Sequence, residues 1–91
     1  LDPRQRKQAT ILYKALQCAA DLAFREPVDV VRQTVRTVLA QEPEVVLDYF
    51  GIAGQDTLVP LEDWGARDRA VALIAAQVGP VRLIDNISLT R

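Results

Sequence analysis

The residues of this chain whose types could do chemistry are few, and the most distinctive lie in one peptide, Arg82-Leu-Ile-Asp-Asn86. In an extended strand, alternate residues face opposite sides, so Arg82 and Asn86 share one face and Asp85 lies on the other. Arg82 and Asp85 could reach a ligand cleft, or they could form salt bridges and turn contacts that fix the end of the strand. We favour the structural interpretation, and for Asn86 we favour a cap on a backbone turn over a contact with substrate.

Three other side chains also have a functional and a structural interpretation. Trp64 could be the aromatic residue of a lid, but we favour a local anchor in an exposed loop. Cys18 is the single cysteine, cannot form a disulfide within the chain and is expected to be a small core residue. Lys14 lies on the solvent-facing side of a predicted helix. We therefore assign no catalytic, cofactor-binding or metal-binding residue to this chain.

The composition of the 91 residues excludes several classes of site. Histidine is absent, which removes histidine-activated nucleophiles and imidazole metal ligands, and one cysteine cannot build a thiolate zinc site. The four glycines do not have the spacing of a phosphate-binding loop. With a net charge of −1 the chain is not expected to bind nucleic acid, and its basic cluster is expected to be a solvated first helical turn: Arg4, Arg6 and Lys7.

Apolar and charged residues make up 49% and 25% of the chain, the ordinary mixture of a globular protein. The length predicts one small domain over residues 1–91. Every apolar run is much shorter than the roughly 20 residues that span a bilayer, so no membrane partner is expected.

The first element expected to position these residues is a helix over about residues 3–25. Asp2 is a suitable N-cap, Pro3 fits the first helical position, and Gln5 stands where a capping-box partner would. The polar residues of its main part form one narrow stripe: Thr10, Lys14, Gln17, Asp21 and Arg25. Two interpretations remain open: the sheet and a further surface both cover this helix, or its alanines lie at half-exposed flanks (Ala9, Ala20 and Ala23).

A second helix is expected over about residues 28–42. Its apolar residues recur at three- and four-residue spacing: Val28, Val31, Val35, Val38 and Leu39. The β-branched side chains favour a strand, but the period and length indicate a helix, which Pro43 ends. The short link at Pro27 predicts that the two helices are antiparallel neighbours.

Three strands are expected over about residues 45–53, 69–77 and 81–88. Gly79-Pro80 is a turn signal and predicts a β-hairpin between the last two. This hairpin is too apolar to stand alone in water, so one of its faces, or both, needs a cover. The segment 58–61, with proline at 60, is restricted to a short sheet edge. The predicted fold class is α+β: two antiparallel helices, then a small antiparallel sheet of about three strands that ends in a β-hairpin.

The chain resembles the C-terminal domain of the pantothenate synthetase (pantoate–β-alanine ligase) family. The resemblance covers essentially the whole chain, with its blocks in the family's order: Leu1-Asp-Pro-Arg-Gln-Arg6, Ala15-Leu16, Leu47-Asp-Tyr-Phe-Gly-Ile52, Asp56-Thr-Leu-Val-Pro-Leu61, Ala70 to Ala76 and Arg82-Leu-Ile-Asp-Asn86. The family usually has an acidic residue where this chain has Gly51, often another near Gly54, and a Gly-x-Thr peptide where this chain has Gly79-Pro80-Val81.

The resemblance implies a function for a larger enzyme. The family condenses pantoate with β-alanine, using ATP and Mg²⁺ through a pantoyl-adenylate. It implies that the ATP-binding residues belong to an N-terminal nucleotide-binding domain, so this chain is expected to hold no cofactor and to be inactive alone. The C-terminal domain is expected to be a hinged lid that keeps water from the adenylate, with its first helix turned partly toward the partner domain. Some cyanobacterial members are fused to a cytidylate kinase, and that possibility remains open here.

Two further hypotheses remain beside the lid. The chain could be a free-standing interaction module that binds a partner protein through an exposed apolar helix face. It could also form a homodimer, because a surface meant for another domain promotes self-association when exposed. A cytoplasmic location is expected in each case, since one unpaired cysteine suits a reducing compartment.

Overall fold

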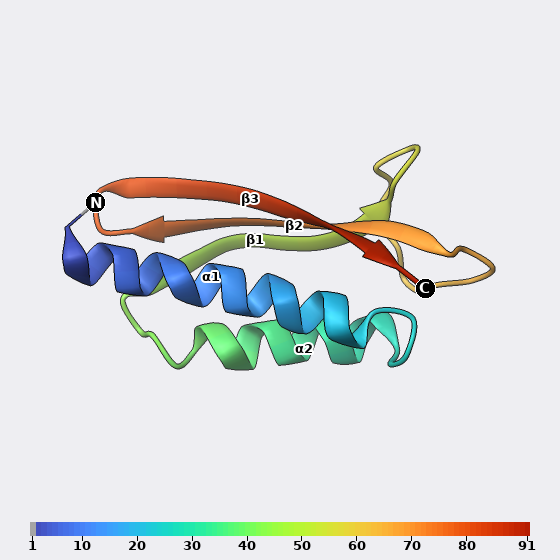
Figure 1. Ribbon diagram of the computed structural model, residues 1–91. Coiled ribbons are helices and arrows are strands. Elements are labelled where there is room, and N and C mark those ends of the chain that lie inside the picture. Colours follow the sequence, from blue (N-terminus) through green and yellow to red (C-terminus); the bar gives the residue numbers. More distant parts are fainter. Residues whose placement is uncertain (1) are drawn as a thin grey trace.

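The computed structural model describes residues 2–91, and Leu1, the first residue of the expected domain, lies outside the described residues. The element order is α1 (Pro3–Leu22), α2 (Val28–Leu39), β1 (Val45–Gly54), β2 (Arg69–Val78) and β3 (Val81–Thr90). The two helices lie side by side against one face of the sheet (Figure 1). The predicted α+β fold class is confirmed, with two helices followed by a three-stranded antiparallel sheet.

Helix α1 begins as the sequence predicts and ends three residues before the expected residue 25. The carboxylate of Asp2 accepts a hydrogen bond from the backbone N–H of Gln5 at 2.7 Å, and the Gln5 side chain accepts one from the N–H of Asp2 at 3.2 Å. Helical geometry stops after Leu22 because Ala23 has ψ 134° and Phe24 has the left-handed φ of 65°.

Helix α2 confirms the helical interpretation of its β-branched sequence, but it ends at Leu39 and not near residue 42. The N–H groups of Gln41 and Glu42 bond to carbonyls three residues back, at 3.2 and 3.1 Å. These tight turns close the helix before Pro43, which disfavours helical geometry in the residue that precedes it.

The sheet has the strand order β1-β2-β3, and each strand continues past its expected end at residues 53, 77 and 88. The hairpin between β2 and β3 turns at Gly79-Pro80, with Val78 opposite Val81. Gly79 has φ 60°, and the following proline fixes a negative φ, the combination of a type II′ hairpin turn. An ideal Cβ on Gly79 would also lie 2.4 Å from the Gln5 amide nitrogen, so this turn packs against the start of α1.

The core lies between the helices and the facing side of the sheet. Its most deeply buried side chains come from every element: Leu16, Val28, Val31, Val35, Ile52, Ile74, Val78 and Leu89. Helix α1 packs against α2 as well as β2 and β3. The further surface expected to cover α1 is therefore α2, with Ala9 and Ala20 half-buried and Ala23 buried.

Strand β1 contains a β-bulge between Leu47 and Tyr49, at Asp48. Without it, alternation would place Tyr49 on the same side as Leu47. The extra residue shifts the alternation, so that Leu47 and Phe50 both pack on the core and Tyr49 faces the side of the sheet without helices.

An aromatic cluster joins three segments that are distant in sequence. Trp64 packs on Phe24 with a ring-centroid distance of 4.5 Å. The indole N–H of Trp64 donates a hydrogen bond to the Glu26 carbonyl at 2.6 Å. The Arg91 guanidinium lies 5.2 Å from the centroid of the Phe24 ring. Trp64 is thus a local anchor as expected: its side chain is buried, while residues 62, 63 and 65–68 of the same loop are exposed. Within residues 2–91, neither helix is both long and apolar enough to cross a membrane.

Two neighbours on β3 provide a matched test of the layer arrangement. Leu83 packs against the core and Ile84 is 71% exposed on the opposite side. Leu83→Ala should lower the free energy of unfolding by about 1–3 kcal/mol, below the full range for a completely buried leucine. Ile84→Ala should change it by less than about 0.5 kcal/mol. Urea denaturation of both variants measures this, and equal losses would contradict the assignment of the two faces.

The Trp64 anchor gives a second stability test. Trp64→Phe keeps an aromatic ring beside Phe24 but removes the indole donor to the Glu26 carbonyl, so unfolding should become easier by about 1–3 kcal/mol. Arg91→Gln removes only the exposed cation–π contact and should cost about 0.5–1 kcal/mol. Circular dichroism during denaturation follows both variants. A smaller loss for Trp64→Phe than for Arg91→Gln would show that the indole hydrogen bond is not the anchor.

Candidate functional site

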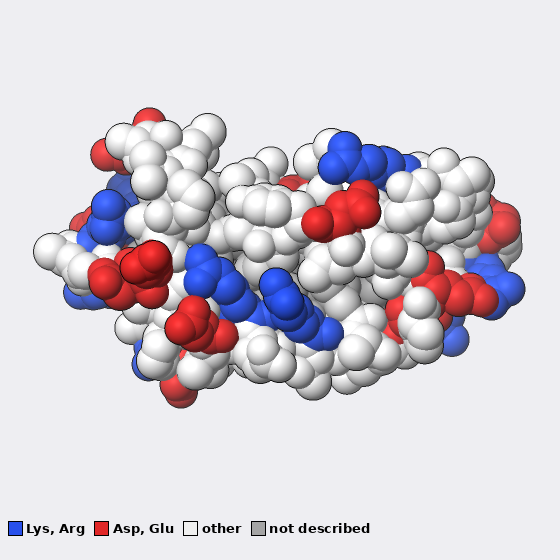
Figure 2. Space-filling model, turned by 180° about the vertical axis from the view of Figure 1, so that it is seen from behind, with Lys and Arg blue, Asp and Glu red and all other residues white. Residues whose placement is uncertain are grey.

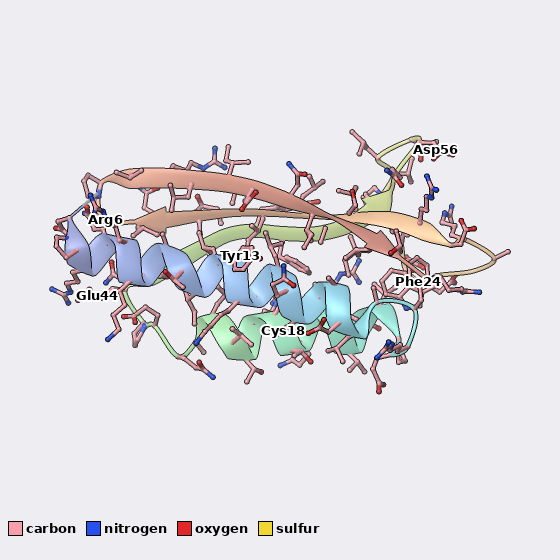
Figure 3. All side chains as sticks on the ribbon, viewed as in Figure 1. Arg6, Tyr13, Cys18, Phe24, Glu44 and Asp56 are labelled. Carbon is pink, nitrogen blue, oxygen red and sulfur yellow. The ribbon has the colours of Figure 1, made fainter. Side chains whose placement is uncertain are left out.

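The candidate chemical residues of the sequence do not meet at one place in the structure. Lys14 is exposed on α1, Cys18 is half-buried on the same helix, and Trp64 lies in the aromatic cluster. Figure 3 labels Cys18, Phe24 and Asp56 at separate positions. Within residues 2–91, no group of three or more His, Cys, Asp or Glu side chains is arranged to hold a metal ion.

Arg82 forms an ion pair that crosses the sheet. Its Nε lies 3.1 Å from Asp48 Oδ2, so a residue of β3 reaches over the middle strand to the bulged residue of β1. Their side chains are 56% and 39% exposed, respectively. The preferred interpretation of Arg82 as a salt-bridge residue agrees with this geometry.

Asp85 and Asn86 differ from what we expected of them. Asp85 faces the helix side of β3, opposite Ile74, and its Oδ1 accepts a hydrogen bond from the backbone N–H of Asn86 at 2.8 Å. Asn86 lies within β3 opposite Leu73, so the expected turn cap is wrong. The strand continues to Thr90, and the chain does not turn at this point.

The basic first turn of α1 is tied to the segment before β1. Arg4 forms an ion pair with Glu44, and the buried side chain of Gln8 donates to the same carboxylate at 2.5 Å. Figure 3 shows Glu44 beside this end of the helix. Figure 2 shows the molecule from behind, where acidic and basic groups are mixed and neither sign dominates the visible surface. The structural interpretation of the cluster agrees with these contacts.

The largest feature left to explain is the side of the sheet opposite the helices, which we call the open face. Strand register assigns its side chains, since directly opposite residues share a face. They are Val46, Tyr49, Gly51 and Ala53 of β1, Val71, Leu73, Ala75 and Gln77 of β2, and Arg82, Ile84, Asn86 and Ser88 of β3. Most of these side chains are apolar, although no helix covers them (Figure 1).

Small residues allow the side chains of the open face to pack closely on the sheet. Ala53 and Ala75 are buried yet do not belong to the core between sheet and helices, and Ala53 is paired with Pro60. Tyr49 lies directly over Gly51, where an ideal Cβ would be 2.1 Å from the tyrosine hydroxyl. A side chain at position 51 would displace that ring, so Gly51 lets Tyr49 lie flat on the open face.

A loop rises beside one end of the open face, on the side away from the helices (Figure 1). It is closed by its own backbone: the N–H of Leu58 donates to the Gly54 carbonyl at 2.8 Å, and the N–H of Gly54 donates to the Val59 carbonyl at 2.9 Å. Pro60 then pairs with Ala53 in an isolated bridge, as expected of a short edge segment. Leu58 has a left-handed φ of 57° and is 60% exposed.

The sequence interpretation found the strands and left open whether one or both faces of the hairpin need a cover, but it did not identify the residues of this surface. One signal was present: the run Ala70 to Ala76 is apolar at every position, and a strand half-covered by helices needs only alternate apolar residues. The bulge at Asp48 had no such signal, so the position of Tyr49 could not be derived.

Comparison with known proteins gives consistent results. Residues 1–88 match the family model described as pantoate-beta-alanine ligase. The chain is 41% identical over 91 residues to the pantothenate synthetase of Koribacter versatilis, covering 98% of this chain and 31% of that protein. It is also 41% identical over 88 residues to the bifunctional pantoate ligase/cytidylate kinase of Synechococcus elongatus, covering 93% of this chain and 16% of that one.

A solved structure agrees in fold. The pantothenate synthetase of Thermus thermophilus superposes with a TM-score of 0.85 at 35% identity, over 96% of this chain and 31% of that one. The chain therefore spans about a third of the length of these single-function relatives, in their C-terminal portion.

The Asp48–Arg82 ion pair can be tested by a double-mutant cycle with Asp48→Asn and Arg82→Gln. Both side chains are partly exposed, so the coupling energy should be only about 0.2–1 kcal/mol, and it should fall further in 1 M salt because screening is strong there. The Asp29–Arg32 pair, also at 3.1 Å, provides a comparison within helix α2, where Arg32 donates in addition to the Leu61 carbonyl at 2.7 Å. A coupling that does not change with salt would contradict a surface ion pair.

Proposed function

This chain belongs to the pantoate–β-alanine ligase family, and from that premise we propose that it is the lid of such a ligase and not the part that carries out the chemistry. The complete enzyme would join pantoate to β-alanine, using ATP through a pantoyl-adenylate. The observation that carries the proposal is the apolar open face on a chain that spans about a third of its relatives.

ATP and Mg²⁺, which the family implies, do not fit the residues described here. Carboxylates and substrate phosphates hold Mg²⁺ in ATP-using enzymes, whereas the acidic residues of this domain are dispersed or engaged, such as Glu44 with Arg4 and Asp48 with Arg82. We therefore assign ATP and Mg²⁺ to an N-terminal nucleotide-binding domain, the partner of this chain in the ligase.

The lid role has a clear physical purpose. An acyl-adenylate is hydrolysed by water, so the enzyme must exclude water until the amine of β-alanine attacks the acyl carbon. A closing domain does this best if it is stiff and presents an apolar surface. Three paired ten-residue strands backed by two helices provide such a plate, and the open face provides the surface. The ligase would act in the cytoplasm.

A second candidate function is that of a free-standing interaction module. The structure changes the basis for that hypothesis, because the wide apolar part of α1 is covered by α2 and the sheet. Any such module would use the open face. The same surface would mediate a homodimer of the isolated chain, which light scattering at increasing protein concentration would detect.

The division of labour gives a direct test. The 91-residue chain, given ATP, pantoate and β-alanine, should form no AMP. A chimera in which this chain replaces the matching segment of the Koribacter versatilis pantothenate synthetase should form AMP and pantothenate in equal amounts. AMP formation by the chain alone would refute the lid proposal, and an inactive but folded chimera would favour the interaction module.

A further inference from the structure

We propose that the open face, together with the loop tip at Leu58 and Val59, is the surface that docks on the rest of the ligase, with the helix layer turned toward solvent. The inference rests on the proposed function and deepens it, because it names which side of the lid meets its partner. It also replaces the expectation that α1 is turned partly toward the partner domain.

The first argument is the unequal distribution of exposed apolar side chains. Large apolar residues that remain exposed on the sheet side are Val46 (56%), Tyr49 (49%) and Ile84 (71%), and the adjoining loop adds Leu58 (60%) and Val59 (56%). The helices expose one each, Tyr13 and Val30, and the hydroxyl of Tyr13 accepts a hydrogen bond from Gln17 Nε2 at 3.0 Å. Isolated exposed apolar residues are normal, whereas a contiguous group indicates an interaction site.

The second argument is size. Three strands of ten residues present a face of roughly 450 Å², from about 3.3 Å per residue along a strand and about 4.8 Å between strands. Interfaces between domains of one chain bury about 600–1,500 Å² in total, or roughly 300–750 Å² on each side. The open face alone is therefore large enough for a domain interface.

The third argument is that the loop is built to hold its apolar tip outward. Leu58 combines a left-handed φ of 57° with 60% exposure, and this backbone conformation is unfavourable for a residue other than glycine. The two hydrogen bonds between Gly54 and the residues Leu58 and Val59 keep this conformation. A preformed loop loses little conformational entropy when it binds, so the strained tip is explained if a partner covers it.

The fourth argument is the arrangement of polar groups. The Asp48–Arg82 ion pair lies toward one end of the open face, near Gln77, which stands opposite both Val46 and Arg82. The centre contains Leu73 and Ala75. An apolar centre with polar groups at its border is the usual anatomy of an interface. The expected partner is thus an apolar surface of the polypeptide that makes up the other two-thirds of the relatives.

The chain contains a matched pair of reporters for this inference. Its only two tyrosines lie on opposite sides: Tyr49 on the open face at 49% exposure, and Tyr13 on α1 at 59%. Nitration by tetranitromethane, followed by peptide mass spectrometry, compares the free chain with the Koribacter versatilis chimera. Both tyrosines should react in the free chain. In the chimera the rate at Tyr49 should fall about tenfold or more, because a covered residue reacts only when the interface opens, while Tyr13 keeps its rate.

Two variants of the chimera separate docking from folding. Ile84→Lys places a charge in the open face and should restore the reactivity of Tyr49 to that of the free chain. Val30→Lys makes the same change at a 41% exposed site on α2 and should leave Tyr49 protected.

Each outcome of the nitration experiment decides between the proposals. Protection of Tyr13 alone, of both tyrosines or of neither would overturn the docking inference. An active chimera with a reactive Tyr49 would overturn the inference while the lid function stands. An inactive chimera with Tyr49 protected would keep the docking face and reject the lid function. Protection of Tyr49 in the free chain at high concentration would assign the open face to a second copy.

Discussion

Two helices can cover only one side of a three-stranded sheet, and this geometric limit shapes the whole molecule. The middle strand β2 is apolar on both sides, with Ala72, Ile74 and Ala76 under the helices and Val71, Leu73 and Ala75 on the open face. The helices pack against each other as well as the sheet, so neither can move around to the second side. The fold is complete on one side of β2 and leaves an apolar surface on the other.

The sequence predicted the structure correctly where residues close together in the chain determine it. Asp2, Pro3 and Gln5 predicted the start of α1, and Gly79-Pro80 predicted the hairpin. Contacts distant in sequence decided the rest. The end of α1 depends on Phe24, whose left-handed backbone is accompanied by packing on Trp64, far along the chain. No pattern within residues 20–28 contains that information, so the helix was predicted too long.

The candidate site was harder to predict than the fold for a related reason. The sequence showed which residues alternate along each strand, but not which side the helices cover or where the alternation shifts. Arg82 was assigned to an ion pair, yet its partner Asp48 is defined by a bulge. The same bulge turns Tyr49 outward over Gly51. Gly51 shares the open face with Tyr49, whereas its neighbours Phe50 and Ile52 belong to the core, so the close contact is confined to one face.

The contact between Asp85 and the backbone of Asn86 has a consequence for how this domain is kept from polymerising. Strand β3 forms an edge of the sheet, and unpaired backbone groups at an edge can recruit strands from other molecules. The Asp85 carboxylate occupies one such donor. On the opposite edge, Pro60 bridges to Ala53 and the bulge interrupts β1. The two edges of the sheet are thus protected against fibre-like, strand-by-strand growth, even though no helix covers the open face.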